Sequence, residues 1–137
     1  MPLNILVVDD SSVTRAMIIK TLKIIGLPLG EIYQAANGLE GIEALEENWV
    51  DIALVDVNMP IMNGEEMLRQ LRETPEGKNL PVIMVSTEGS QTRIESLQEQ
   101  GAKFVHKPFA PEAIRQAIVE ITGISYEPTS TESDTDF

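Results

Sequence analysis

The sequence predicts a single α/β domain in which a five-stranded parallel sheet is doubly wound, with five helices on its two faces. Its 137 residues have the size of one ordinary domain, and 42% of them are hydrophobic, which is enough to fill a core. Short apolar runs alternate strictly with longer stretches in which apolar residues recur at helical spacing. Such alternation is typical of a parallel sheet that helices cover on both faces.

The five predicted strands differ in polarity, and the difference suggests their order in the sheet. Residues 5–8, 52–55 and 82–85 are continuous apolar runs, as strands buried on both faces require. Residues 32–36 and 103–106 include polar side chains, so the second and fifth strands are expected at the edges. The order 2-1-3-4-5, which is that of flavodoxin-like sheets, fits this distribution.

Helices are predicted between the strands, at residues 11–25, 39–49, 65–72, 92–100 and 111–121. A set of mostly apolar residues shares one face of the first helix, namely Met17, Ile18, Thr21, Leu22 and Ile25. Glycines stand where helices are expected to stop, at Gly26, Gly101 and Gly123. Gly64 stands where the third helix is expected to begin.

The composition excludes several classes of function. The chain has 22 acidic and 10 basic residues, a net charge of −12, so it repels the phosphates of nucleic acids and of anionic lipids. Neither nucleic acid nor membrane is therefore expected as a partner. No stretch approaches the ~18 apolar residues of a membrane helix, and the first residues lack the features of a secretory leader, so the cytoplasm is the expected location. Without cysteine there is no disulfide and no thiolate metal site.

Two parts are distinguished along the chain. Residues 1–124 contain all the predicted strands and helices and form the expected folded domain. Residues 125–137 contain four acidic residues, no basic residue and several serines and threonines, a composition typical of a flexible, solvated tail. Docking of this segment on a partner or on the domain itself is the alternative.

Polar side chains follow directly on the ends of four predicted strands. They are Asp9 and Asp10 after the first strand, Asp56 after the third, Ser86 and Thr87 after the fourth, and Lys107 after the fifth. Because ligands of such sheets bind beyond the carboxyl ends of the strands, these side chains are expected to converge at one rim. Each has an ordinary alternative when taken alone, such as a helix cap for Asp10 or an exposed base for Lys107. Four independent coincidences would be needed for all the alternatives to hold.

The predicted cluster has an excess of negative charge. Asp9, Asp10 and Asp56 bring three negative charges, of which Lys107 offsets one. Like charges about 4 Å apart repel by about 4 kcal/mol at an effective dielectric constant near 20. A divalent cation would offset the remaining negative charge. The donors are all oxygen atoms, with no His or Cys among them, and such a set favours Mg²⁺. The one histidine, His106, is expected to be a packing residue. With the cation and Lys107 in place, a phosphoryl group could approach Asp56 and form an acyl phosphate.

Together these residues resemble the response-regulator receiver domain and, more narrowly, the single-domain chemotaxis receivers of the CheY type. The resemblance rests on Asp9-Asp10, Asp56-Val57-Asn58-Met59-Pro60, Asn63-Gly64, Ser86 and Lys107-Pro108-Phe109, in this order and spacing. It runs from about residue 4 to residue 121. It implies the fold derived above, for which these receivers are themselves an established example.

The resemblance implies a role for each residue of the cluster. Asp56 would accept a phosphoryl group from a histidine kinase. Asp10, Asp56 and the backbone carbonyl of Asn58 would bind Mg²⁺, with Asp9 acting mainly through water. Ser86 would bond one phosphoryl oxygen, Lys107 would pair with another, and the peptide that follows Lys107 would be cis.

The resemblance also implies a switch, an output surface and a short-lived signal. Phe104 would pack inward when Ser86 moves toward the phosphoryl group, and the fourth helix, fifth strand and fifth helix would bind an effector protein. Asn58 and Glu88 would flank the water that hydrolyses the phosphoryl group. Phe104 replaces the Tyr that chemotaxis receivers usually carry, and Thr87 replaces a small residue, so the switch lacks a hydroxyl and access to the acceptor is narrower.

Three other functions compete with a phosphorylation-switched signalling protein that has no output domain. A haloacid-dehalogenase-type phosphohydrolase would use Asp56 as its nucleophile, but it needs a second Asp where this chain has Asn58, which cannot transfer a proton. A flavodoxin-like carrier would bind a flavin phosphate beside Asp9 and Asp10, which repel it. A receiver used only as a scaffold would not need the complete set of acceptor residues. No enzymatic activity beyond phosphotransfer to and hydrolysis from Asp56 is therefore expected.

We expect deletion of residues 126–137 to leave the melting temperature and the phosphorylation of the chain nearly unchanged, because this acidic segment offers little to a hydrophobic core. Thermal denaturation of the full and truncated chains measures the effect. A drop of several degrees would show instead that the segment docks on the domain.

Overall fold

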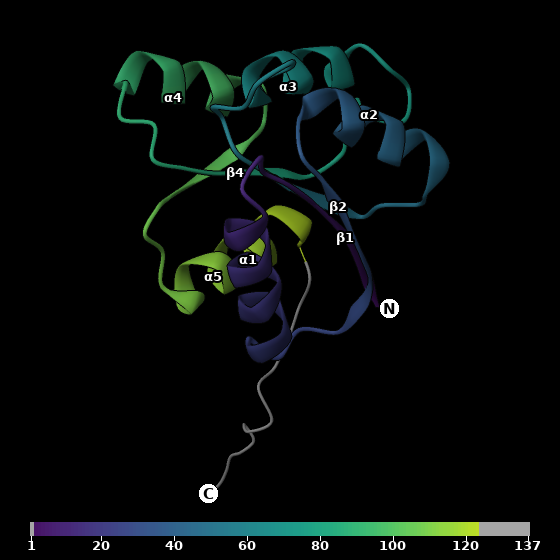
Figure 1. The fold of residues 1–137 in the computed structure, drawn as a ribbon, viewed down its shortest axis with the longest axis vertical. Coiled ribbons are helices and arrows are strands. Elements are labelled where there is room, and N and C mark those ends of the chain that lie inside the picture. Colours follow the sequence, from purple (N-terminus) through teal and green to yellow (C-terminus); the bar gives the residue numbers. More distant parts are fainter. Residues whose placement is uncertain (1, 124–137) are drawn as a thin grey trace, which may run out of the picture.

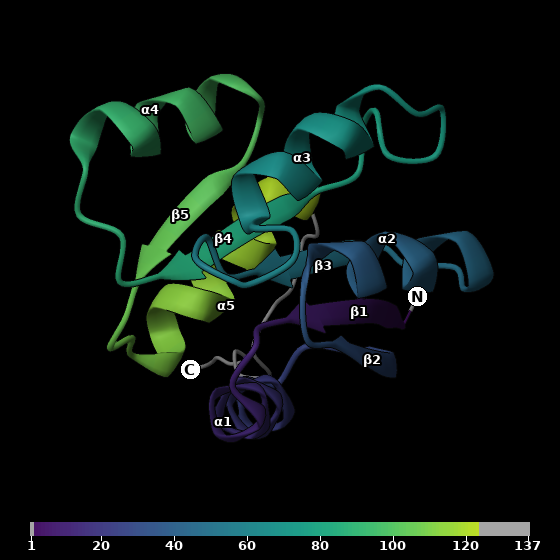
Figure 2. The ribbon, with the colours of Figure 1, turned by 45° about the horizontal axis from the view of Figure 1, so that its top comes forward.

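Five parallel strands form one sheet in the order β2-β1-β3-β4-β5, as the sequence predicts (Figures 1 and 2). The strands are β1 (Leu3–Val8), β2 (Leu29–Ala35), β3 (Ile52–Val55), β4 (Val82–Ser86) and β5 (Lys103–His106). The computed structural model describes residues 2–123, so the predicted domain boundary and the predicted tail at 125–137 lie outside the described residues. The two strands with polar side chains, β2 and β5, are the edges, which confirms the order inferred from polarity.

Helices cover both faces of the sheet. They are α1 (Ser12–Ile24), α2 (Gly38–Glu47), α3 (Gly64–Arg72), α4 (Gln91–Glu99) and α5 (Pro111–Thr122). α1 and α5 pack on one face and α2, α3 and α4 on the other, which Figure 1 shows as a lower and an upper layer. Within residues 2–123, no helix has the length and apolar character needed to cross a lipid bilayer.

Alternate residues of the central strands build two separate cores. In β1, Ile5 and Val7 pack with α1 and α5, whereas Leu6 and Val8 pack with the helices of the opposite face. All four side chains are almost inaccessible to solvent. Burial of one such side chain contributes about 1.5–3 kcal/mol. The continuous apolar runs of the sequence are thus explained by strands that are buried on both faces.

The edge strand β2 begins earlier than predicted, at Leu29 instead of residue 32. Leu29 pairs with Leu3, and the register of the β1–β2 ladder then shifts before Ile5. The side chain of Asn4 bridges this irregularity, because its Oδ1 accepts a hydrogen bond from the Glu31 backbone N–H at 2.9 Å. The extra strand residues are therefore held partly by a side chain, which no apolar pattern reveals.

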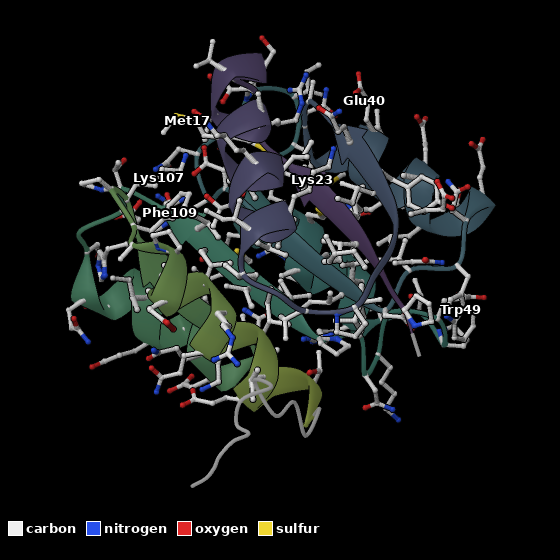
Figure 3. All side chains as sticks on the ribbon, turned by 90° about the horizontal axis from the view of Figure 1, so that it is seen from below. Met17, Lys23, Glu40, Trp49, Lys107 and Phe109 are labelled. Carbon is white, nitrogen blue, oxygen red and sulfur yellow. The ribbon has the colours of Figure 1, made fainter. Side chains whose placement is uncertain are left out.

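Most of the predicted apolar face of α1 is buried. Ile18, Thr21 and Leu22 face the sheet, but Met17 is 57% exposed and projects from the helix, as Figure 3 shows. Met17 lies about a quarter turn from the centre of the buried stripe, so the helix geometry leaves it at the boundary with solvent. The prediction that Met17 shares the packed face is wrong.

The ends of the helices agree with the expected signals. Ser11 caps α1, since its Oγ accepts a hydrogen bond from the Thr14 N–H at 3.2 Å. The alternative that Asp10 is merely the cap of this helix is therefore wrong, and its carboxylate is available to the strand-end cluster. The three glycines predicted as stops, Gly26, Gly101 and Gly123, all have positive φ angles, of 82°, 90° and 70°.

The start of α3 packs against the backbone of the segment that carries Asp56. Asn63 caps α3 together with Glu66, and the N–H of Gly64 donates to the Val57 carbonyl at 2.9 Å. A Cβ placed on Gly64 would lie 2.2 Å from the carbonyl oxygen of Asp56. Only glycine fits this contact without moving the backbone.

We expect Gly64→Ala to lower the free energy of unfolding by about 1–3 kcal/mol, since the added methyl group would displace the backbone at Asp56. Gly89→Ala is the matched control, because a Cβ at Gly89 meets nothing within 4 Å. Urea denaturation of the two variants measures the difference. Equal losses of stability would contradict the close contact at Gly64.

Candidate functional site

Polar side chains from four strand ends meet at one rim of the sheet. Asp9 follows β1, Asp56 follows β3, Ser86 ends β4 and Lys107 follows β5. Carboxylate oxygens of Asp9, Asp10 and Asp56 lie within 4.8 Å of one another. The convergence predicted from the strand ends is therefore present in the structure.

Lys107 is the cation of this cluster. Its backbone N–H donates to the Ser86 carbonyl at 2.9 Å, which continues the β4–β5 ladder by one bond. Its Nζ lies 2.8 Å from Asp9 Oδ2 and 3.7 Å from Asp56 Oδ2. The Lys107–Pro108 peptide is cis, as predicted. Lys107 thus compensates Asp9 more closely than it compensates Asp56.

The three carboxylates have different surroundings. Asp9 is 1% exposed, and its two oxygens are both engaged, Oδ2 by Lys107 and Oδ1 by the Ser11 N–H at 2.9 Å. Asp56 is 8% exposed, and Asp10 lies open to solvent. Asp9 is therefore a fixed anion that holds the lysine, while Asp10 is accessible to a solvated ion.

Burial raises the pKa of Asp56 above its ordinary value. The largest opposing effect is the hydrogen bond from the hydroxyl of Ser86, which is itself fully buried, and the attraction of Lys107 comes next. Repulsion from Asp9 adds to the effect of burial. The ionised form of Asp56 is thus only partly compensated by its neighbours.

The cluster suits a small divalent cation. Its donors are carboxylate oxygens, which are the ligands that Mg²⁺ prefers, and its net charge after Lys107 is still negative. A cation between the carboxylates would relieve the repulsion that Asp9 exerts on Asp56. The donor set and the charge of the site are therefore consistent with Mg²⁺.

A hydrogen-bonded group lies beside the cluster and includes a residue that sequence reasoning missed. Asn58 Nδ2 lies 3.4 Å from Glu88 Oε1, so the two predicted flanking residues are close together. Arg93 joins them, with its Nη1 donating to Glu88 Oε1 at 2.8 Å and to Asn58 Oδ1 at 3.2 Å. Glu88 Oε2 accepts a hydrogen bond from the Ser90 backbone N–H, and this bond is the main cause that lowers the pKa of Glu88. Thr87 is exposed. Arg93 and Glu88 are five residues apart, a spacing that indicates no pairing in a sequence.

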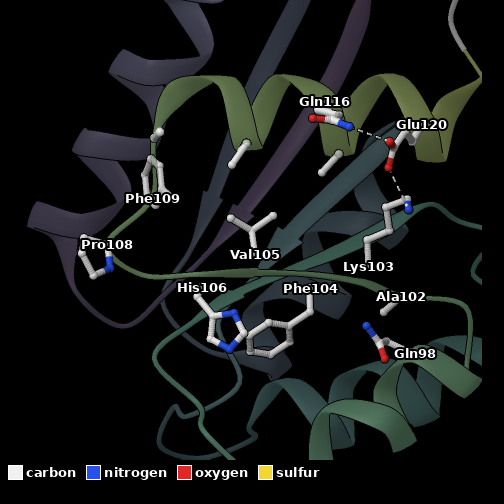
Figure 4. Close-up of a pocket in the computed structure, with 13 residues that line it drawn as sticks. Gln98, Ala102, Lys103, Phe104, Val105, His106, Pro108, Phe109, Gln116 and Glu120 are labelled. Atoms are coloured by element: carbon white, nitrogen blue, oxygen red, sulfur yellow. Dashed lines mark hydrogen bonds and ion pairs between the residues drawn. The ribbon is translucent and has the colours of Figure 1, made fainter. Parts of the chain in front are cut away.

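β5, α4 and α5 surround a hollow of about 660 Å³, which Figure 4 shows in close-up. Phe104 is half-buried and its ring centroid lies 4.7 Å from that of His106. His106 is exposed, so the prediction that it packs inside is wrong. Side chains of a strand alternate between the two faces of the sheet, so Phe104 and His106 lie on the face covered by α2, α3 and α4, where Phe104 packs against that core. Val105 points into the core on the face of α1 and α5. An ion pair of 3.0 Å joins Lys103 and Glu120 at the rim of the hollow.

The chain is similar to known proteins in both sequence and structure. The family model of the response regulator receiver domain matches residues 5–119. A chemotaxis protein CheY homolog of Campylobacter jejuni is 32% identical over 123 residues, which are 88% of this chain and 93% of the relative. Chemotaxis protein CheY1 of Helicobacter pylori is also 32% identical, over 88% of this chain and 98% of its own. The solved structure of chemotaxis protein CheY4 from Vibrio cholerae superposes with a TM-score of 0.78 at 31% identity, covering 88% of this chain and 99% of that one.

We expect Asp56→Asn to raise the free energy of unfolding at pH 7 without Mg²⁺, on the order of 1 kcal/mol, because it removes a charge that burial disfavours. An acid whose pKa is raised on folding destabilises the folded state at high pH only. The gain should therefore disappear as the pH falls below about 3, where the parent Asp56 is protonated in both states.

Asp9→Asn is the comparison variant, since it also removes a buried carboxylate charge but breaks the 2.8 Å ion pair with Lys107. We expect it to lower stability by about 1–3 kcal/mol at pH 7. Denaturant unfolding at several pH values measures both variants. A loss of stability in Asp56→Asn at pH 7 would contradict the conclusion that the ionised Asp56 is only partly compensated by its neighbours.

Proposed function

The chain belongs to the response regulator receiver domain family, and on this basis we propose that Asp56 accepts a phosphoryl group from a histidine kinase. It is a CheY-like receiver of two-component signal transduction. One observation carries the proposal: the buried carboxylate of Asp56 lies beside the two groups that can hold phosphoryl oxygens, the Ser86 hydroxyl and the Lys107 ammonium.

In the proposed transfer, a carboxylate oxygen of Asp56 forms a bond to phosphorus while the bond between phosphorus and a histidine nitrogen of the kinase breaks. The electron pair of the broken bond stays on that nitrogen, and the product is an acyl phosphate on Asp56. Ser86 donates a hydrogen bond to one phosphoryl oxygen. Lys107, whose Nζ is 3.7 Å from Asp56 Oδ2, pairs with another.

We infer that the carboxylate cluster binds Mg²⁺ through Asp10, Asp56 and the backbone carbonyl of Asn58. When bound, the ion offsets negative charge on the transferring phosphoryl group. Asp9 acts mainly through water, and the engagement of both its oxygens by Ser11 and Lys107 supports this outer position. Carboxylate oxygens are ligands that Mg²⁺ prefers, so the residues present fit this ion.

We propose that phosphorylation changes the binding of an effector protein to the face formed by α4, β5 and α5. The hollow on this face and the half-buried ring of Phe104 support the choice. Ser86 pairs with His106 in the sheet, and Phe104 lies two residues earlier on the same strand, so a shift of Ser86 reaches the ring within the β4–β5 ladder. Because Phe104 has no hydroxyl, its switch acts by packing alone.

The chemotaxis relatives make the control of motility the proposed process.

The phosphoryl group is then lost by hydrolysis on the domain itself, with Asn58 and Glu88 flanking the water and Thr87 partly shielding the approach. Both flanking residues are polar and lie in hydrogen-bond contact with each other, which supports a shared role. Catalysis on any other substrate is not proposed, because Asn58 occupies the position of the second acid that a phosphohydrolase needs. Residues 1–124 are proposed to suffice for all these steps.

We expect acetyl phosphate to phosphorylate the protein only in the presence of Mg²⁺. Asp56→Asn should abolish the modification, and Asp10→Asn should slow it by about tenfold or more through the loss of a metal ligand. Mass spectrometry of the intact protein measures both effects. Glu43→Gln, which removes an exposed carboxylate from α2, is the control and should react at the parent rate. Full modification of Asp56→Asn at the parent rate would refute the assignment of the acceptor.

A further inference from the structure

Arg93 connects three polar side chains that come from three other segments of the chain. Its Nη1 bonds Glu88 Oε1 at 2.8 Å, in the loop between β4 and α4, and Asn58 Oδ1 at 3.2 Å, in the loop after β3. Its Nε bonds Glu65 Oε1 at 3.1 Å, on the first turn of α3. One guanidinium on α4 thus joins the two loops beside Asp56 to α3.

The group differs from an ordinary surface ion pair, whose contribution is small. The side chains of Arg93 and Glu65 are 29% exposed and that of Glu88 is 12% exposed, so all three are largely shielded from water. The planar guanidinium presents its donors in a fixed fork, which fits partners on two sides at once. A lysine has a single point charge and cannot hold the same three partners in this arrangement.

The bonds to Arg93 occupy polar atoms of Asn58 and Glu88, the two residues proposed to flank the hydrolytic water. Asn58 Oδ1 accepts from Arg93, and Asn58 Nδ2 points to Glu88 Oε1. Glu88 Oε1 also accepts from Arg93, while Glu88 Oε2 accepts from the Ser90 N–H. A water that approaches Asp56 beside Asn58 must therefore compete with Arg93 for the amide oxygen.

We propose that Arg93 is a positioning residue that slows the loss of the phosphoryl group from Asp56 by holding Asn58 and Glu88 away from the hydrolytic water. The inference rests on the proposed function of Asp56. In the hydrolysis, a water oxygen forms a bond to phosphorus while the bond from phosphorus to the Asp56 oxygen breaks. The electron pair stays on the carboxylate, and both protons of the water leave with inorganic phosphate as H₂PO₄⁻. Arg93 takes no part in these bonds and acts only through Asn58 and Glu88.

The test follows the decay of the phosphoryl group in the full chain. The protein is labelled with radioactive acetyl phosphate and Mg²⁺, the donor is removed, and the remaining label is measured over time. We expect Arg93→Ala to lose the label about three- to tenfold faster than the parent, as the loss of one or two hydrogen bonds to a charged group allows. Arg93→Lys keeps the charge but not the fork, and it should decay nearly as fast as Arg93→Ala.

Matched variants separate this effect from a general loss of charge or stability. Arg69→Ala removes an exposed arginine from the last turn of α3, outside the group, and should decay at the parent rate. In an Asn58→Ala background, Arg93→Ala should cause little further change, because the two residues act through the same contact. A purely structural role of Arg93 would instead give additive effects, which would overturn the proposal.

The outcomes for Arg93 and for Asp56 are distinguishable. If Arg93→Ala takes up the label and loses it at the parent rate or more slowly, the role assigned to Arg93 is wrong while that of Asp56 stands. If Arg93→Ala does not fold, Arg93→Lys and Glu65→Gln carry the same comparison, since Glu65 holds the Nε of Arg93. If the parent protein takes up no label, the proposed function itself is overturned.

Discussion

Two buried carboxylates on neighbouring strands impose the constraint on which the rest of this structure depends. β1 and β3 pair in register up to Val8 and Val55, and each carries an aspartate directly beyond that pair. Charges placed this close to two apolar cores are costly unless a cation compensates them. Lys107 supplies the compensation from 98 positions along the chain. This pairing requires that β5 end at the same rim as β1, and the parallel sheet with its crossover helices brings these ends together.

The compensation is unequal, and this inequality gives the site its chemistry. Asp9 has the short contact to Lys107 and a backbone N–H on its other oxygen, whereas Asp56 has the longer contact and a raised pKa. A ligand that brings positive charge or hydrogen-bond donors is therefore stabilised more by contact with Asp56 than by contact with Asp9. Asp9 thus holds the lysine in place, while Asp56 is the less compensated of the two buried carboxylates.

The features that could be predicted from the sequence are those encoded by neighbouring residues. The change from apolar to polar at each strand end predicts the positions of Asp9, Asp56 and Lys107, and the polarity of β2 and β5 predicts the edges. Arg93 could not be predicted, because its contacts depend on how far α4 lies from two loops. The early start of β2 depends on a side chain of β1, and the exposure of Met17 depends on a quarter turn of α1. Such details are set by tertiary geometry, on which periodicity carries no information.

The close approach of Gly64 to the Asp56 carbonyl also determines how the domain can respond to a ligand. With no space for a methyl group between them, the N-terminus of α3 and the segment that carries Asp56 are in direct backbone contact. The loop that follows β4 contains Gly89, around which there is free space. Displacements that begin at Asp56 are therefore expected to be larger in the loop after β4 than at the N-terminus of α3. Atomic fluctuations should follow the same asymmetry, with small amplitudes at the N-terminus of α3 and larger ones at residues 87–90.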